Sequence, residues 1–379
     1  MAGAVAFIVL GESYIASHCV PMLRAANELN LAATVIGPVG AHRDLLEAEE
    51  AREIPLNAGR SGFSPIRAGH AAGQIAAELK SVKPDLVHCV GLRSVLIGGA
   101  AAAMAGIGRR VYGLPGLGYR ATKAGLLGAG TRASLRVLLT EQLRSAGTRF
   151  VFEAEEDAGL LHLDPSDARL VTTVGGPGIA PEMLRPSAPP PSPPLRVATL
   201  ARASWADGTE VVIEAVRLAR AQGAEIELSI YAGPEPSSRQ LSDKKLRAWS
   251  NESGVVWQGP VEDAALLWGA HHVACLPSRG GDGLPRMLVE AASCGRPVVT
   301  TDVPGPGRLV RDGLEGFLVP PEDAPALAAA LAKFAADPVL VPRMGAAARA
   351  RVLHGFTERD VTDELKRLYA DMLGGPARP

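Results

Sequence analysis

A glycine-rich loop followed by a short helical segment is the part of this sequence best suited to bind an anion. Gly280, Gly281 and Gly283 let the backbone approach a ligand closely, and a helix is expected over residues 283–294. Pro285 suits the opening turn of that helix, where its missing N–H costs nothing. Because a helix N-terminus carries unpaired N–H groups and a partial positive charge, the pattern predicts a diphosphate site.

Two acidic side chains belong to the same segment. Asp282 precedes the expected helix, and Glu290 lies two turns into it, with seven residues between the two acids. Both would meet a polar ligand if the helix opened onto a cleft. A plain crossover between two strands, with a solvated acid at each end, gives the same pattern, so the glycine loop alone leaves both interpretations open.

The elements that must position this segment come in two similar halves. In the first half, short β-rich runs alternate with helical patterns, which is typical of βαβ units around a parallel sheet. The apolar stretch from Ser94 to Gly108 is shorter than the ~20 residues that a bilayer span needs and is expected to be a buried helix. Strands are expected at residues 5–11, 32–37, 85–91, 109–114, 149–154 and 169–175, and helices through 21–29 and 68–82.

A proline-rich segment separates the halves. Residues 185–196 contain six prolines and cannot continue a helix or a central strand, so 185–195 is expected to be a linker. The sequence predicts an α/β, GT-B-like architecture: two Rossmann-like parallel-sheet domains, residues 1–184 and 196–379, facing each other across a cleft, with a last helix at about 356–373 packed back on the first domain. Beyond the linker, strands are expected at 196–202, 225–233, 255–259, 272–278 and 296–301, and helices at 207–222 and 283–294.

The segment PSRGGDGLPRMLVEAASCGRPVVTTDVPG (277–305) resembles the signature of retaining glycosyltransferase family 4, whose members have the GT-B fold. The likeness is greatest to the branch that extends undecaprenyl-diphosphate-linked sugars in bacterial polysaccharide and glycan assembly. Five further segments are found in the expected order: SHCVPMLRAANEL (17–29), KPDLVHCVG (83–91), GLPGLGYR (113–120), VGGPGIAPEMLRP (174–186) and VRDGLEGFLVPPEDAPALAAAL (310–331).

The resemblance implies a retaining, metal-independent glycosyltransferase. Such an enzyme moves a sugar from a nucleotide-diphosphate sugar, here expected to be a UDP-sugar, to a hydroxyl of a lipid-linked or other saccharide acceptor. It needs no further cofactor. Two alternatives stay open: a sugar-nucleotide epimerase on the same fold, and a non-catalytic homologue that binds a nucleotide sugar.

The family's site residues can be carried over to this chain. Asp282 would contact the hydroxyls of the donor sugar, and Glu290 would bind the ribose, so these two acids are the expected catalytic pair. Arg202 matches the family's diphosphate-binding arginine, whose planar fork suits phosphate oxygens. The chain departs from the family at Asp207, where a lysine is usual, and at Asp282, where Glu is usual. The implied donor site comprises Arg202, Gly283, Leu284, Pro285 and Glu290.

Candidates for the acceptor side lie in the first half. Gly11 follows the first expected strand, His18 and His88 lie near strand ends or helix starts, and Arg120 closes the segment GLPGLGYR. A lone histidine is more often a satisfied structural residue than a ligand-binding one, and a glycine after a strand is often ordinary turn chemistry. The acceptor role is therefore a hypothesis for all four.

The net charge and the cysteine content limit the kinds of partner and site that this chain can have. The net charge of -1 argues against a nucleic-acid binder. The four cysteines are scattered and form no CxxC pair, which argues against a zinc site or a disulfide framework. This cysteine pattern fits a protein of the reducing cytoplasm. Residues 86–149 nevertheless hold nine basic residues and one acid. Within them Arg132, Arg136 and Arg144 fall on one helical stripe beside leucines, which favours an anionic membrane surface over a merely solvated helix face. A peripheral protein on the inner face of the membrane is expected.

Overall fold

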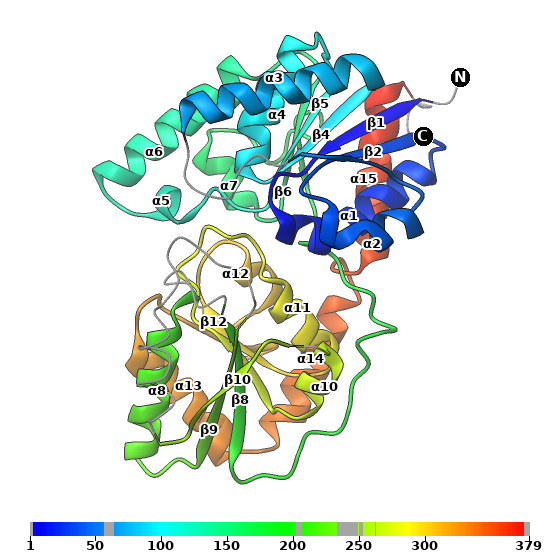
Figure 1. The fold of residues 1–379 in the computed structure, drawn as a ribbon. Coiled ribbons are helices and arrows are strands. Elements are labelled where there is room, and N and C mark those ends of the chain that lie inside the picture. Colours follow the sequence, from blue (N-terminus) through cyan, green and yellow to red (C-terminus); the bar gives the residue numbers. More distant parts are fainter. Residues whose placement is uncertain are drawn as a thin grey trace. The chain divides into compact units, whose positions relative to one another are not determined.

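The computed structural model describes residues 3–56, 64–201, 207–232, 249, 253–261 and 263–374. The chain divides into two compact units (Figure 1). The first comprises Met1–Gly178, Gly281–Gly283 and Glu358–Pro379, and the second comprises Ile179–Gly280 and Leu284–Thr357. Each unit is a parallel sheet with helices packed on both faces, so the α/β expectation of two Rossmann-like domains is confirmed.

The first unit has a seven-stranded sheet of order β3-β2-β1-β4-β5-β6-β7, and all of its pairings are parallel. The central strands β4 and β5 are buried along their whole length, because helices cover both faces of the sheet. The strands are β1 (Ala4–Ile8), β2 (Ala32–Gly37), β3 (Arg52–Pro55), β4 (Leu86–Val90), β5 (Arg110–Leu114), β6 (Thr148–Phe152) and β7 (Val171–Thr173).

Two apolar cores lie on the two faces of this sheet. One is built mainly with α3 and α4, and the other mainly with α1 and α15. The buried helix expected near Ser94 is α4. The helical elements are α1 (Glu12–Asn27), η1 (Gly40–His42), α2 (Arg43–Ala48), α3 (Pro65–Val82), α4 (Leu92–Met104), α5 (Tyr119–Thr122), α6 (Leu126–Arg136), η2 (Val137–Gln142), α7 (Glu155–Leu160) and α15 (Glu358–Leu373).

The second unit repeats this architecture with six parallel strands of order β10-β9-β8-β11-β12-β13. Its strands are β8 (Leu195–Ala201), β9 (Ile226–Ala232), β10 (Val255–Gly259), β11 (Val273–Leu276), β12 (Val298–Thr301) and β13 (Gly316–Val319). Its helices are α8 (Thr209–Ala221), α10 (Ala264–Gly269), α11 (Arg286–Ser293), α12 (Pro306–Leu309), α13 (Ala324–Ala336) and α14 (Leu340–Val352).

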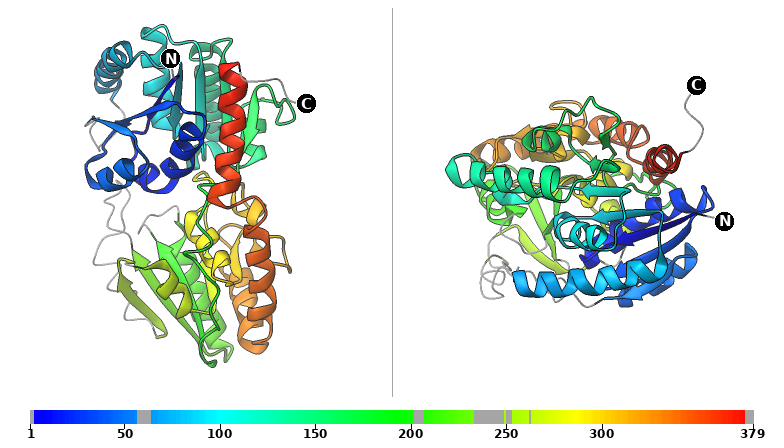
Figure 2. Two further views of the ribbon diagram at one scale, coloured as in Figure 1. Left: turned by 90° about the vertical axis from the view of Figure 1, so that its right-hand side faces the viewer. Right: turned by 90° about the horizontal axis from the view of Figure 1, so that it is seen from above.

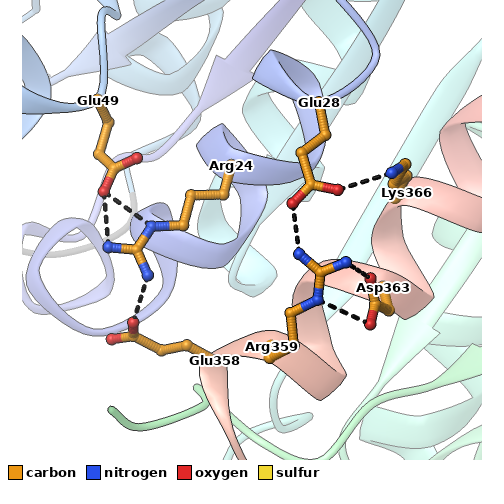
Figure 3. A network of polar contacts seen from close by, with 7 residues as sticks. All are labelled: Arg24, Glu28, Glu49, Glu358, Arg359, Asp363 and Lys366. Atoms are coloured by element: carbon orange, nitrogen blue, oxygen red, sulfur yellow. Dashed lines mark hydrogen bonds and ion pairs between the residues drawn. The ribbon is translucent and has the colours of Figure 1, made fainter. Parts of the chain in front are cut away.

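The last helix of the chain, α15, belongs to the first unit, where it lies beside α1 (Figure 2). Its buried residues Val361, Leu365 and Tyr369 join the core that α1 and the sheet form. Ion pairs add to this packing at the surface: Arg24 bonds Glu49 and Glu358, and Glu28 bonds Arg359 and Lys366 (Figure 3).

The proline-rich segment is fastened to the second unit. Arg296 donates hydrogen bonds to the carbonyl oxygens of Ser187 and Ala188 at 3.0 and 3.3 Å. The ring of His272 bonds the carbonyl oxygen of Pro190 at 2.9 Å. The first unit ends at Gly178, so residues 179–184, which the sequence assigned to the N-terminal domain, lie with the second unit.

The prediction of one basic helical stripe is wrong for Arg144. Helix α6 ends at Arg136, a π-helical segment follows to Gln142, and Arg144 lies beyond it. A π-helix has more residues per turn than an α-helix. The i, i+4, i+12 spacing therefore does not place Arg144 on the same helical stripe as Arg132 and Arg136. Arg132 donates to the carbonyl oxygens of Ala121 and Lys123, at 2.8 and 2.9 Å, and so ties α6 to α5.

Candidate functional site

The glycine loop of the second sheet connects β11 to α11. Gly280 and Gly283 have φ angles of 82° and 73°, a region that residues with a side chain rarely adopt, which explains the glycines. Pro285 caps the helix in an extended conformation, and α11 begins one residue later, at Arg286. The loop and helix therefore have the form that the sequence predicted, with the helix starting slightly late.

Glu290 is partly enclosed on α11. Its Oε1 accepts a hydrogen bond from Nε of Arg286 at 2.8 Å, and its side chain is 15% exposed. Burial raises the pKa of Glu290, and the charge and hydrogen bond of Arg286 act in the opposite direction. The arginine one turn earlier thus holds this carboxylate in one orientation. Asp282 is half-buried in the loop, and buried Leu284 follows it.

The two arginines nearest the loop are both paired with carboxylates. Arg279 is 6% exposed and bonds Glu210 through Nη2 and Glu322 through Nε, each at 2.7 Å. Arg286 bonds Glu290. Asp207, which stands where the family has lysine, is buried just before α8. Arg202 lies outside the described residues.

A small hollow lies within the first unit. It opens where β4, β5 and β6 end, and α1 and α15 complete its wall. The carboxyl ends of parallel strands are where ligands bind in open α/β sheets. Its lining is apolar apart from three polar side chains, His18, His88 and Glu153.

His18 and Glu153 form the polar pair of this hollow. Nε2 of His18 lies 2.8 Å from Oε1 of Glu153, and their side chains are 16% and 3% exposed. Nδ1 of His18 lies 2.6 Å from the hydroxyl of Ser17. Sequence reasoning proposed His18 but missed Glu153, because 135 positions separate the two. An acid directly after a buried strand was the one available signal.

His88 is buried and has a structural partner. Its Nδ1 lies 2.7 Å from the hydroxyl of Tyr369 on α15. Burial and the charge of His18 lower the pKa of His88 to about 3, so its ring is neutral near neutral pH. His88 therefore joins the sheet to α15 and also lines the hollow.

The other two acceptor-side candidates lie elsewhere. Gly11 caps α1 with an ordinary extended conformation, and a Cβ there would come within 2.9 Å of the ring of Tyr14. Arg120 is exposed on α5. Neither residue lines the hollow that contains His18 and His88.

Neither a metal-ligating cluster nor a single membrane-spanning helix is present in the described part of the chain. Among those residues, no group of three or more His, Cys, Asp or Glu is placed to hold a metal ion. No single helix there is long and apolar enough to cross a membrane; only α13 and α14, as a pair bent by 111°, pass that test of length and composition.

Sequence comparisons match each half of the chain separately. Residues 5–141 match the family model "Glycosyl transferase 4-like", and residues 194–337 match "Glycosyl transferases group 1". The chain is 33% identical over 186 residues to the putative colanic acid biosynthesis glycosyltransferase WcaL of Salmonella typhimurium, a match that covers 47% of this chain and 45% of that protein. It is 37% identical over 113 residues to the phosphatidyl-myo-inositol mannosyltransferase of Mycobacterium leprae, covering 29% and 30%.

The chain thus spans about half the length, or less, of these curated relatives. Among solved structures, Anabaena HepE in complex with UDP and glucose superimposes with a TM-score of 0.73 at 18% identity, covering 99% of this chain and 100% of that one. At this identity the likeness concerns the fold. Both halves of the chain match glycosyltransferase family models, and its fold is that of the GT-B glycosyltransferases.

Proposed function

We propose that this protein transfers a sugar from a nucleotide-diphosphate sugar, with UDP as the first nucleotide to test, to a hydroxyl of a saccharide acceptor, with retention of the anomeric configuration. The observation that carries the proposal is the glycine loop leading into α11, with Glu290 held by Arg286, within a chain whose two halves match glycosyltransferase models. The UDP bound by HepE supports the choice of nucleotide.

The donor would be held mainly by the second unit. In this proposal Glu290 binds the ribose, and Arg286 keeps the carboxylate of Glu290 in one orientation. Asp282 contacts the donor sugar, and Arg202 contacts the diphosphate. The leaving nucleotide diphosphate gains negative charge as the glycosidic bond breaks. In this proposal the backbone N–H groups of Gly283 and Leu284, with the first turn of α11, would stabilise that charge.

We further propose a lipid-linked acceptor met at the inner face of the cytoplasmic membrane. The supporting observation is the surface at the start of α6, where Leu126 and Leu127 are 93% and 86% exposed and carry no apolar cover. Arg120 and Lys123, both exposed, precede them. Exposed leucines beside basic residues suit insertion into an anionic membrane surface. The names of the two curated relatives, a colanic acid glycosyltransferase and a phosphatidyl-myo-inositol mannosyltransferase, fit such acceptors.

A transfer assay tests the proposal. The purified protein is incubated with a membrane lipid extract and a panel of radiolabelled UDP-, GDP- and ADP-sugars, and the anomeric configuration of the product is read by NMR. We expect transfer from one nucleotide sugar, with the new linkage keeping the donor's α or β configuration. Conversion of a UDP-sugar without acceptor would instead indicate an epimerase. Nucleotide binding without any turnover would indicate a non-catalytic homologue.

A further inference from the structure

Two threonines on β12 donate buried hydrogen bonds to β11 and to the loop that follows it. Thr300 and Thr301 are both fully buried. The hydroxyl of Thr300 donates to the carbonyl oxygen of Leu276, the last residue of β11, at 2.8 Å. The hydroxyl of Thr301 donates to the carbonyl oxygen of Ser278, beyond the end of that strand. The two side chains thus make the same kind of bond, one to the strand and one to the loop.

The backbone ladder between these strands does not continue into the loop. Its last registered pair is Leu276 and Thr300. The residue after Leu276 is Pro277, which has no N–H group to donate. The hydroxyl of Thr301 therefore supplies a bond at the point where the ladder stops, and it fixes the Ser278 peptide, at which the glycine loop begins.

The next two residues of the loop are held as well. The N–H group of Gly280 donates to the hydroxyl oxygen of Ser278 at 3.0 Å, in a buried bond. Arg279, between them, is bonded to Glu210 and Glu322, each at 2.7 Å. Three consecutive residues are thus each fixed by a side-chain bond, and Gly280 keeps a φ of 82°, which residues with a side chain rarely adopt.

Order of this kind matters for an anion site that is lined by backbone. Such a site binds through N–H groups, and its affinity is higher when their directions are already set in the free protein. In the proposed function the nucleotide diphosphate meets the N–H groups of Gly283 and Leu284, which follow the fixed stretch directly in the chain. The inference below rests on that proposed function.

We propose that Thr301 is a positioning residue for nucleotide binding, because its buried hydroxyl sets the start of the glycine loop. Thr301 itself touches no reacting atom. It acts through the Ser278 peptide and through the bond from Gly280 to the Ser278 hydroxyl. Thr300 is equally buried on the same strand, but it bonds a residue of β11 rather than the loop, so it should not share this role.

The test compares Thr301→Val with the matched control Thr300→Val. Each change removes one buried hydroxyl and its bond to a carbonyl oxygen while keeping the shape of the side chain. Thr301→Ser restores the hydroxyl, and Ser278→Ala removes the acceptor of the Gly280 N–H group. The probe is UDP, titrated by calorimetry into each purified chain. Thermal unfolding and amide hydrogen exchange of the peptide that spans residues 277–283 are measured on the same samples.

We expect Thr301→Val to weaken UDP binding about fivefold, the change in an equilibrium constant that corresponds to one net hydrogen bond. Thr300→Val should bind UDP as tightly as the unchanged chain, although both valine variants should lose similar thermal stability. Thr301→Ser should recover most of the affinity. Exchange of the loop amides should be faster in Thr301→Val and in Ser278→Ala than in Thr300→Val.

Equal loss of UDP affinity in both valine variants would reveal a general effect of β12 and overturn the role of Thr301. Unchanged affinity of a folded Thr301→Val would overturn it as well, and either result leaves the proposed function standing. Absence of binding of UDP, GDP and ADP alike by the unchanged chain would refute the proposed function and this inference with it. If Thr301→Val fails to fold, Ser278→Ala decides the question by the same comparison with Thr300→Val.

Discussion

The exposed leucines of α6 make a quantitative prediction about membrane binding. Leu126 and Leu127 are 93% and 86% exposed, so together they offer nearly two full leucine side chains to a membrane. Full burial of one leucine is worth about 1.5–3 kcal/mol. If each inserts to half its depth, the pair contributes about 1.5–3 kcal/mol, which is roughly a 10- to 100-fold change in binding.

The assay is co-sedimentation with vesicles of phosphatidylcholine containing phosphatidylglycerol. The double change of Leu126 and Leu127 to Ser should weaken binding by that factor and leave thermal stability unaltered, because neither side chain is buried. The matched control changes Leu266 and Leu314 to Ser, since these leucines are also exposed, at 73% and 52%, but belong to the second unit. Equal loss of binding in both double variants, or no loss in either, would refute the role of α6.

Two further predictions follow from a buried acid and from a substituted charge. Asp157 has a folded pKa of about 7 against an ordinary 3.8, so its contribution to stability is complete below about pH 4 and is lost as the pH rises through 7. Asp157→Asn should therefore raise the melting temperature at pH 8 and leave it nearly unchanged at pH 4; an equal effect at both values would contradict the assignment. Asp207→Lys should tighten UDP binding in calorimetry, since a repulsive charge becomes attractive, and unchanged affinity would mean that Asp207 does not face the diphosphate.

Much of the fold could be predicted because buried parallel strands form continuous apolar runs. The strand at Ala32–Gly37 has the bounds that were expected, and the central strands differ from expectation by one to a few residues at their ends. The edge strands β3 and β13 were not expected. They are only four residues long, and β3 (REIP) carries an arginine, a glutamate and a proline, which hide the pattern.

Two helices show where the local sequence pattern predicts the structure poorly. Helix α1 begins at Glu12, well before the expected segment, and continues through Pro21. Proline usually breaks a helix interior, so the sequence suggested a later start. At the end of α6 the π-helical segment moves Arg144 off the expected stripe, and spacing in the sequence does not reveal such a segment.

In the candidate site, too, features that are local in sequence could be predicted and long-range contacts could not. The glycine loop and α11 are contiguous in sequence, so their form could be predicted. The pairing of Glu290 with Arg286 follows the usual i, i+4 spacing but was not anticipated. His18 and Glu153 meet only because β1, β4, β5 and β6 lie in one sheet, a long-range fact that a single sequence does not contain.

The central claim is that Glu290 on α11 binds the nucleotide of the donor. Calorimetric titration of UDP into the unchanged chain, Glu290→Ala and the control Glu225→Ala tests it most directly, because it needs neither the donor sugar nor the acceptor. Glu225 is an exposed acid at the start of β9, at the opposite end of the strands from the glycine loop. Loss of a charge-assisted hydrogen bond costs about 1.5–3 kcal/mol, so Glu290→Ala should weaken UDP binding at least about 10-fold while Glu225→Ala binds normally. Equal UDP affinity of all three folded proteins would contradict the account.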